Sequence, residues 1–149
     1  MNVHGTYEFH AARQRVFDAI CDPQTLMAVI PGCRNVQRSA SGDYEGSISL
    51  RLPGAAGTYR THVRLVDVVP PERSGLEGRL DGAMGTISGR ASFVLSDEPG
   101  ATRIVYDGDA LIQGPLARLD SRFAERVAET LIGQGLKALD ARLRTEAAA

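Results

Sequence analysis

The sequence predicts an α+β domain in which a curved antiparallel sheet of about seven strands wraps a long C-terminal helix, with two short helices after the first strand. Three observations predict it. Alternating apolar and polar residues, typical of half-buried strands, run from Cys33 to Ile112. Apolar residues at helical spacing occupy segments on either side of this run. Short turns join the clustered strands, so the sheet must be antiparallel rather than built from βαβ units.

The chain opens with a strand followed by two short helices. Residues 3–9 alternate between an apolar and a polar face, and residues 13–20 then change to helical spacing. Asp22 and Pro23 separate the two helices, because Asp is a favourable N-cap and Pro fits the first turn of the helix that follows. Pro31 and Gly32 end this second helix.

Alternation then continues through the strands of the predicted sheet, over residues 42–52, 58–69, 76–81, 87–95 and 104–112. Turns at Pro70-Pro71 and at Pro99-Gly100 separate some of these strands. Each strand therefore offers one face to the core and one face to solvent.

The segment from Leu116 to Leu143 predicts one long helix, which begins where Gly114 and Pro115 allow a helix to start. Its roughly 28 residues span about 42 Å, whereas a domain of this size has a radius of gyration of about 15 Å. The apolar stripe of this helix changes sides at Gly133 and Gly135, so we expect a bend there that acts as a hinge for ligand entry. The alternative is a second half that serves a partner, a membrane surface or a ligand mouth.

Length and composition suit a single domain over residues 1–149. The formal net charge is −1 and charges of both signs are interspersed, so we expect no nucleic-acid partner. The hydrophobic runs fall short of the ~18 residues that span a bilayer, and the first residues lack the pattern of a signal peptide. Cys21 and Cys33 are too few for a disulfide framework, so the chain is expected to be cytoplasmic.

Small residues at inner-face positions of the strands predict a cavity between sheet and helix. A packed core would place larger aliphatic side chains at these positions, which are Gly46, Gly78, Gly89, Ala91, Gly108 and Ala110. Because protein interiors are close-packed, space kept open indicates an apolar occupant or a pocket open to solvent. The alternative is a strongly curved sheet whose core is filled by large residues of the helix. Inward tyrosines would suit a lipophilic ligand with one or two polar groups.

We predict that the ligand contacts inner-face residues of the strands and the first apolar stripe of the long helix. This set comprises Tyr44, Ile48, Tyr59, Val63, Ile87, Phe93, Tyr106, Gly108, Phe123, Val127 and Leu131. Filling the cavity by Gly108→Leu is expected to exclude the ligand and to leave the fold intact, because added methylenes would occupy empty space.

The sequence offers no set of residues able to carry a reaction. His4, His10 and His62 fall on polar faces, and none has a metal-ligand partner at a recognised spacing. Asp107 and Asp109 alternate outward, as solvated surface carboxylates do. The sequence has no nucleophile elbow, P-loop or dinucleotide-binding glycine pattern. We therefore expect no catalytic residue, no metal and no cofactor.

Several segments, the opening one most of all, follow the pattern of a known family. The opening GTYEFHAARQRVFDAICDPQTLMAVIPGC combines a strand, an arginine-and-valine helix, a D-P turn and I-P-G-C, at Arg15, Val16, Asp22, Pro23, Ile30, Pro31, Gly32 and Cys33. Further similar pieces are Val69-Pro70-Pro71, GRLDGAMGTISGRASFVL, TRIVYDGDALIQGPLA and the region of Phe123. Over nearly its whole length the chain resembles the CoxG family, named after the G subunit of carbon monoxide dehydrogenase.

This resemblance implies the helix-grip fold of the START-like, birch-allergen-like (SRPBCC) superfamily, in which a sheet surrounds a long C-terminal helix over an apolar cavity. It also implies an accessory protein of a molybdenum hydroxylase of the carbon monoxide dehydrogenase type, acting in assembly, membrane recruitment or quinone delivery. No catalytic residue carries over from the family. Many members have a longer C-terminal tail with an apolar anchor, whereas this sequence ends at Ala149, which argues against membrane recruitment by this chain.

Our leading hypothesis from the sequence is therefore non-enzymatic binding of a quinone- or lipid-like molecule in service of such an oxidoreductase. One alternative is an enzyme of the polyketide cyclase or dehydratase kind, which shares the superfamily but needs polar groups in its cavity. Another is an assembly factor whose cavity is incidental. The expected location is the cytoplasm, and peripheral contact with the inner face of the membrane is kept as a further alternative.

Overall fold

The computed structural model describes residues 1–52 and 54–148, and these form seven strands, three α-helices and one 3-10 helix. The strands are β1 (Asn2–Phe9), β2 (Cys33–Arg38), β3 (Tyr44–Leu50), β4 (Gly57–Val69), β5 (Arg73–Gly82), β6 (Gly85–Glu98) and β7 (Ala101–Gln113). The helices are α1 (Arg13–Ile20), α2 (Pro23–Val29), the 3-10 helix η1 (Pro115–Arg118) and α3 (Ser121–Ala148). The order of elements confirms the α+β prediction.

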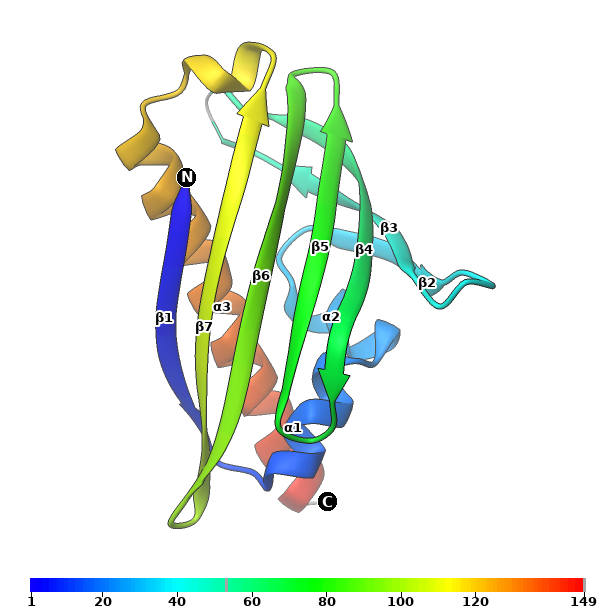
Figure 1. Ribbon diagram of the computed structural model, residues 1–149, viewed down its shortest axis with the longest axis vertical. Helices are drawn as coiled ribbons and strands as arrows, with labels where there is room; N and C mark the ends of the chain where they lie inside the picture. The colour runs from blue at the N-terminus through cyan, green and yellow to red at the C-terminus, as the bar shows by residue number, and fades with distance from the viewer. Residues whose placement is uncertain (53, 149) are drawn as a thin grey trace.

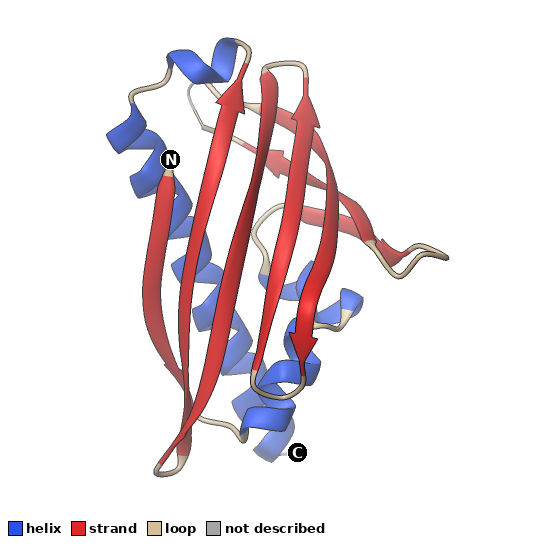
Figure 2. Ribbon diagram, in the orientation of Figure 1, coloured by secondary structure: helices blue, strands red, loops and turns tan. Residues whose placement is uncertain are grey.

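All seven strands belong to one antiparallel sheet with the order β1-β7-β6-β5-β4-β3-β2. The edges of the sheet are therefore β1 and β2, and α1 and α2 carry the chain from one edge to the other (Figure 2). The long helix α3 runs behind the sheet along its length (Figure 1), where it contacts β1, α1 and α2. A sheet wrapped on one long helix is the closure that the sequence predicts.

The start of α2 shows how local chemistry fixes the short helices. The Asp22 carboxylate accepts hydrogen bonds from the Thr25 backbone N–H at 3.2 Å and from the Thr25 hydroxyl at 2.6 Å. These bonds satisfy a backbone donor that the first turn leaves unpaired. They also hold the pKa of Asp22 below its ordinary value. The predicted N-cap at Asp22, with Pro23 in the first turn, is confirmed.

The long helix begins later than the sequence analysis predicts. Residues 115–118 form the separate 3-10 helix η1, and Leu119 after it has an extended backbone. Asp120 then starts α3, because its carbonyl oxygen accepts the first helical hydrogen bond from Ala124 N–H at 2.9 Å. Asp is a favourable residue at this position, so the break is a second helix start within the apolar pattern. The prediction of one helix from residue 116 was wrong, since it placed the start of α3 five residues too early.

The helix α3 continues through Gly133 and Gly135 without interruption, and its second apolar stripe is buried. Leu139 and Leu143 are buried in a core that also contains Phe9, Val16 and Phe17. The earlier stripe lies toward a second, smaller cluster around Tyr59, Ala55 and Leu116. The second half therefore does not present its leucines to a partner or membrane. No helix in the described part of the chain, α3 included, has the apolar stretch that crossing a bilayer requires.

We expect Gly133→Ala/Gly135→Ala to raise the free energy of unfolding by about 1–2 kcal/mol, because Ala favours the helix over Gly at both sites. The structure leaves room for a Cβ atom at both positions. A Cβ at Gly133 meets no described atom beyond its own turn within 4 Å, and one at Gly135 lies 3.8 Å from the Val29 carbonyl oxygen. Urea denaturation measures the gain, and a loss of stability would contradict it. If the glycines act as a hinge, stopped-flow exchange of an apolar probe should also slow.

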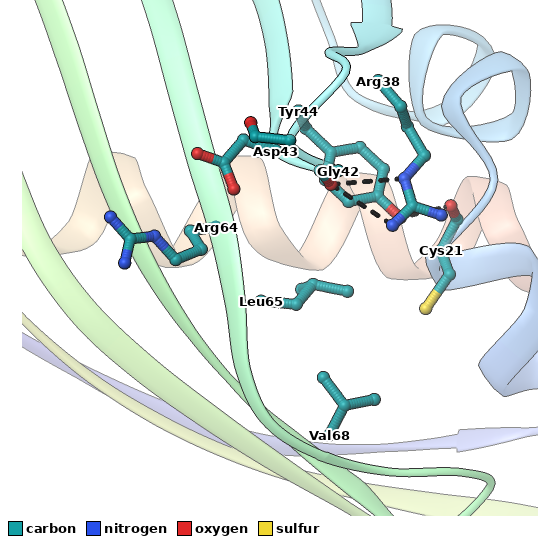
Figure 3. A pocket seen from close by; sticks show the side chains of 9 residues that line it. Cys21, Arg38, Gly42, Asp43, Tyr44, Arg64, Leu65 and Val68 are labelled. Carbon is teal, nitrogen blue, oxygen red and sulfur yellow. Dashed lines mark hydrogen bonds between the residues drawn. The ribbon is translucent and has the colours of Figure 1, made fainter.

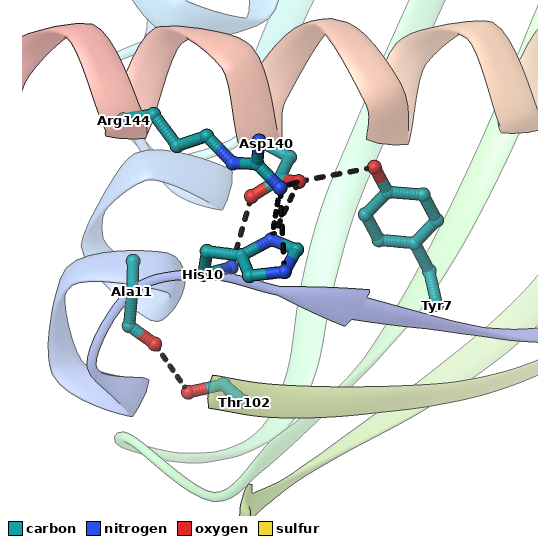
Figure 4. A network of polar contacts seen from close by, with 6 residues as sticks. All are labelled: Tyr7, His10, Ala11, Thr102, Asp140 and Arg144. Carbon is teal, nitrogen blue, oxygen red and sulfur yellow. Dashed lines mark hydrogen bonds and ion pairs between the residues drawn. The ribbon is translucent and has the colours of Figure 1, made fainter. Parts of the chain in front are cut away.

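A buried carboxylate fastens α3 to the end of β1 (Figure 4). Asp140 is 4% exposed, and its two oxygens accept hydrogen bonds from the His10 backbone N–H at 2.9 Å and from the Tyr7 hydroxyl at 3.2 Å. The His10 ring lies 3.1 Å away, and the Arg144 guanidinium lies 3.4 Å away one turn along α3. We call Tyr7, His10, Asp140 and Arg144 the clasp. The sequence analysis placed His10 on a polar face and gave Asp140 no role.

Candidate ligand-binding site

An apolar cavity of about 320 Å³ lies between α3, η1 and the neighbouring ends of the strands. Its lining comes from several strands or strand ends and from both η1 and α3. The lining residues are Met1, Ile48, Leu50, Leu52, Ala55, Leu80, Ile87, Ile112, Leu116, Leu119, Phe123, Ala124, Val127, Ala128, Leu131 and Ile132. The cavity thus adjoins the smaller of the two core clusters.

Every residue that lines this cavity has an apolar side chain. Its volume falls at the lower end of the range of roughly 300–1,000 Å³ found for small-molecule pockets. An engineered cavity of about 150 Å³ with similar walls holds one benzene molecule, so this one suits an apolar group about twice that size. The walls favour hydrocarbon by excluding water, and they offer an occupant no side-chain hydrogen bond.

Five of the eleven residues predicted to contact ligand line the cavity: Ile48, Ile87, Phe123, Val127 and Leu131. A sixth, Tyr59, is fully buried behind the lining, where it packs with the cluster that contains Ala55 and Leu116. Its hydroxyl donates a hydrogen bond to the Ala55 carbonyl oxygen at 2.9 Å, and burial raises the pKa of Tyr59. That hydroxyl is therefore already engaged within the protein.

The other five residues lie elsewhere on the inner side of the sheet, because alternation predicts a face but not a position along it. Phe93 and Tyr106 pair across β6 and β7, six residues from the Ile87–Ile112 pair that lines the cavity. At about 3.3 Å per residue this separation is about 20 Å. Phe93 is buried in the larger core against Phe17, with ring centroids 6.1 Å apart. That the ligand contacts these five residues stays a prediction.

Tyr44 borders a different hollow, beside the turn of the β2–β3 hairpin (Figure 3). Its hydroxyl donates a hydrogen bond to the Cys21 carbonyl oxygen at 2.6 Å, and the Arg38 guanidinium lies 5.1 Å from the centre of its ring. Val63 pairs with Tyr44 and with Gly78 across the sheet, outside the lining of the apolar cavity. Burial raises the pKa of the Cys21 thiol, so this hollow holds no thiolate nucleophile at neutral pH.

The small residues that predicted the cavity have a different role. Gly78, Gly89 and Ala110 are register neighbours on β5, β6 and β7, and Ala91 pairs with Gly108 in the next row. A Cβ at Gly89 would overlap the carbonyl oxygen of Asp109 on β7. Gly89 therefore permits close backbone approach in the curved sheet, which supports the alternative interpretation, whereas a Cβ at Gly78 would make only ordinary contacts. The cavity floor is the adjacent row, Leu80, Ile87 and Ile112, made of large side chains.

The expectation that Gly108→Leu leaves the fold intact conflicts with this packing. Gly108 is buried, and an added Cβ would lie 3.0 Å from the Ala91 Cβ and 3.2 Å from the Arg90 carbonyl oxygen. Because a larger side chain would overpack this site, we now expect a loss of about 1–3 kcal/mol in the free energy of unfolding. Thermal denaturation checks this, and a variant as stable as wild type would restore the original expectation.

The fold and the cavity agree with a comparison of the sequence with known families. The family model for the G subunit of carbon monoxide dehydrogenase (CoxG) matches residues 5–144. The chain belongs to the CoxG family. No curated protein matches this CoxG chain.

Solved structures similar to this CoxG chain share its fold at low sequence identity. A conserved protein from Geobacillus kaustophilus has a TM-score of 0.93 at 21% identity, over 97% of this chain and 96% of that one. A protein from Chromobacterium violaceum has a TM-score of 0.73 at 18% identity, over 95% and 96%. A START superfamily protein from Mycobacterium smegmatis has a TM-score of 0.70 at 15% identity, over 97% of both chains. The architecture is thus the helix-grip fold of START-like proteins.

The described part of the CoxG chain contains no cluster of three or more His, Cys, Asp or Glu side chains able to hold a metal ion. Cys33 resembles Cys21 in that burial raises the pKa of its thiol. His62 lies on the outer face, where its ring is 3.0 Å from the Asp43 carboxylate. None of these groups lines the apolar cavity, and the side chains that line it include no acid, base or nucleophile.

The sequence analysis did not predict the part of the lining that comes from the segment around η1 and from small residues of α3. Leu116 and Leu119 turn back over the cavity because η1 interrupts the helix. Ala124 and Ala128 lie one turn apart on α3 beside Phe123 and Val127. The sequence did contain a signal for this part of the lining, namely the spacing of the two alanines along the predicted stripe. Small side chains on a core-facing stripe leave room between the helix and the sheet.

Proposed function

We propose that this CoxG chain is a non-enzymatic binding protein that encloses the apolar part of a quinone- or lipid-like molecule. The observation that carries the proposal is the cavity of about 320 Å³ with a wholly apolar lining. Hydrocarbon that leaves water for an apolar cavity is stabilised by about 0.8 kcal/mol for each methylene buried. Binding of this kind needs no reacting group in the protein.

We further propose that the chain serves a molybdenum hydroxylase of the carbon monoxide dehydrogenase type. Support for this partner comes from membership of the CoxG family, which takes its name from carbon monoxide dehydrogenase. A carrier that shields a lipophilic molecule from water would exchange it with such a partner in the cytoplasm or at the inner face of the membrane.

An enzyme of the polyketide cyclase kind is the main alternative, and it would need polar groups directed into the cavity. The hydroxyl groups of Tyr44, Tyr59 and Tyr7 donate to a backbone carbonyl, a second backbone carbonyl and the Asp140 carboxylate, respectively. These three hydroxyls are engaged elsewhere, and Tyr106 packs against the larger core and does not line the cavity, so the binding function is the better supported of the two.

Mass spectrometry of organic extracts from the purified protein tests the proposal. We expect one class of lipophilic molecule to be enriched, in stoichiometric amount, over extracts from an unrelated protein purified in the same way. A fluorescent apolar probe should bind the extracted protein and be displaced by the molecule recovered. An extract without enriched lipophiles, together with a protein that binds no apolar probe, would overturn the proposed function and favour an assembly role.

A further inference from the structure

The apolar cavity shares lining residues with two neighbouring hollows that are bordered by arginines. Leu52 and Leu131 line the cavity and both hollows. One of the hollows is lined by Arg34 and Arg51 and the other by Arg126. We call these three arginines, together with Leu52 and Leu131, the mouth. A molecule leaving the cavity past the two leucines therefore meets cationic side chains.

The charges at the mouth are not balanced by acidic neighbours. Neither of the two outer hollows has an Asp or Glu in its lining. Within the described part of the chain, no carboxylate lies within 4.0 Å of the guanidinium groups of Arg34, Arg51 or Arg126, whereas Arg79 pairs with Asp81 at 2.8 Å and Arg142 pairs with Glu146 at 3.4 Å. The formal net charge of the chain is −1, so the arginines do not follow from an excess of basic residues. The mouth is a local concentration of positive charge.

The donors at the mouth come from three different elements of the fold. Arg34 lies on β2, Arg51 directly follows β3, and Arg126 lies on the first half of α3. All three side chains are exposed, so they retain their water and are free to form hydrogen bonds with a ligand. A guanidinium presents a planar fork of N–H donors that matches the oxygens of a carboxylate or phosphate. The cavity beyond the two leucines holds only apolar groups.

We propose that the ligand is an amphiphile with an anionic head, a carboxylate or a phosphate, which the three arginines hold at the mouth while its apolar tail fills the cavity. This inference rests on the proposed binding function and narrows its ligand class. A neutral quinone head accepts hydrogen bonds through its carbonyl oxygens but gains less from the positive charge than an anion does. The positive charge attracts an anionic head, and the apolar lining accommodates the tail. The mouth therefore determines which head binds, and the cavity determines which tail binds.

The test compares amphiphiles that share a dodecyl tail and differ in their heads: dodecanoate, dodecyl phosphate and uncharged dodecanol, each displacing a fluorescent apolar probe. At low salt we expect both anions to bind about 10-fold more tightly than dodecanol, which corresponds to about 1.4 kcal/mol. Salt screens exposed charges, so this preference should shrink as ionic strength rises. Inorganic phosphate alone should not displace the probe.

The matched variants are Arg34→Gln/Arg51→Gln/Arg126→Gln at the mouth and Arg73→Gln/Arg90→Gln/Arg103→Gln on the outer face of the sheet, away from β2. All six arginines are exposed, so both variants should fold as wild type does, which circular dichroism checks. The mouth variant should bind all three amphiphiles with equal affinity, and the outer-face variant should keep the preference. Lysine at the three mouth positions should restore part of it.

Equal binding of dodecanol and the anions by wild type would overturn the anionic-head inference and leave the proposed function standing. A mouth variant that keeps the preference for the two anions would also overturn the anionic-head inference. The same holds for a mouth variant that binds anionic phosphatidylglycerol vesicles less tightly but keeps its preference among free amphiphiles. That last result would assign the arginines to a membrane surface. Displacement of the probe by none of the three amphiphiles would instead count against the proposed function itself.

Discussion

The double substitution Ala124→Leu/Ala128→Leu should lower the affinity for a long apolar ligand by at least about 100-fold and leave the fold intact. Both alanines line the cavity from α3. The six added carbon atoms match those of benzene, which fills a cavity of about 150 Å³, so about half of the space would be lost. A tail forced to withdraw about four methylenes loses about 3 kcal/mol. Fluorescence displacement with tails of increasing length measures this.

The control places the same substitutions on the same helix outside the cavity. Ala138 and Ala141 are exposed on α3, and Ala138→Leu/Ala141→Leu should leave affinity unchanged. Ala and Leu are both good helix formers, so neither variant should lose helical stability. Short tails should still bind the cavity variant with near wild-type affinity. Unchanged binding of long tails would show that ligand does not use this cavity, and unfolding of the variant would show that the space is already filled.

The fold could be predicted from the sequence because its signals are local. Alternation marked the strands, and Asp22-Pro23 marked the boundary between α1 and α2. The similarity of the opening segment to CoxG proteins then specified the helix-grip arrangement, in agreement with the family match over residues 5–144. The late start of α3 had a local signal too, in Asp120, but the continuous apolar spacing from Leu116 concealed it.

The site could be predicted only in part, because its geometry depends on pairings between distant residues. Periodicity placed Ile87 and Phe93 on the same face of β6, but it did not show that only Ile87 lies beside η1. The inner-face glycines indicated an unusual sheet, and alternation gave no means to tell open space from close backbone approach. Only the register of β5, β6 and β7 shows that Gly89 lies against the backbone of β7.

The grouping of the three arginines at the mouth could not be predicted from the sequence, for a related reason. Arg34, Arg51 and Arg126 are far apart in the chain, and each occupies an exposed position typical of an ordinary solvated face. Leu52, which follows β3, and Leu131 on α3 come to line the same two hollows only in the folded chain. The function of such an exposed charged side chain depends on the hollow that it borders.

Asp140→Ala should lower the free energy of unfolding by about 3 kcal/mol, because it removes a buried carboxylate that accepts charge-assisted hydrogen bonds, which contribute about 1.5–3 kcal/mol each. The substitution would remove the acceptor for the His10 backbone N–H and for the Tyr7 hydroxyl. For a chain of this size the loss corresponds to a fall of about 6–12 °C in Tm. Asp140→Asn keeps the shape and one acceptor oxygen, so it should cost less. Glu129→Ala, at an exposed position of α3, is the matched control and should have little effect.

The clasp also predicts how stability depends on pH. Burial acts to raise the pKa of Asp140, but the hydrogen bonds from His10, the charge of Arg144 and the Tyr7 hydroxyl outweigh it and hold that pKa below its ordinary value. A carboxylate whose pKa is lowered by folding stabilises the native state above its unfolded value of about 3.9, and this contribution disappears as pH falls through the folded value. The difference in free energy of unfolding between wild type and Asp140→Asn should therefore be at its maximum at about pH 6–7 and shrink below about pH 4. Urea denaturation of both proteins across this range measures the difference. A difference that stays constant down to about pH 3 would mean that the carboxylate charge does not hold α3 to β1, and that Asp140 acts through its shape alone.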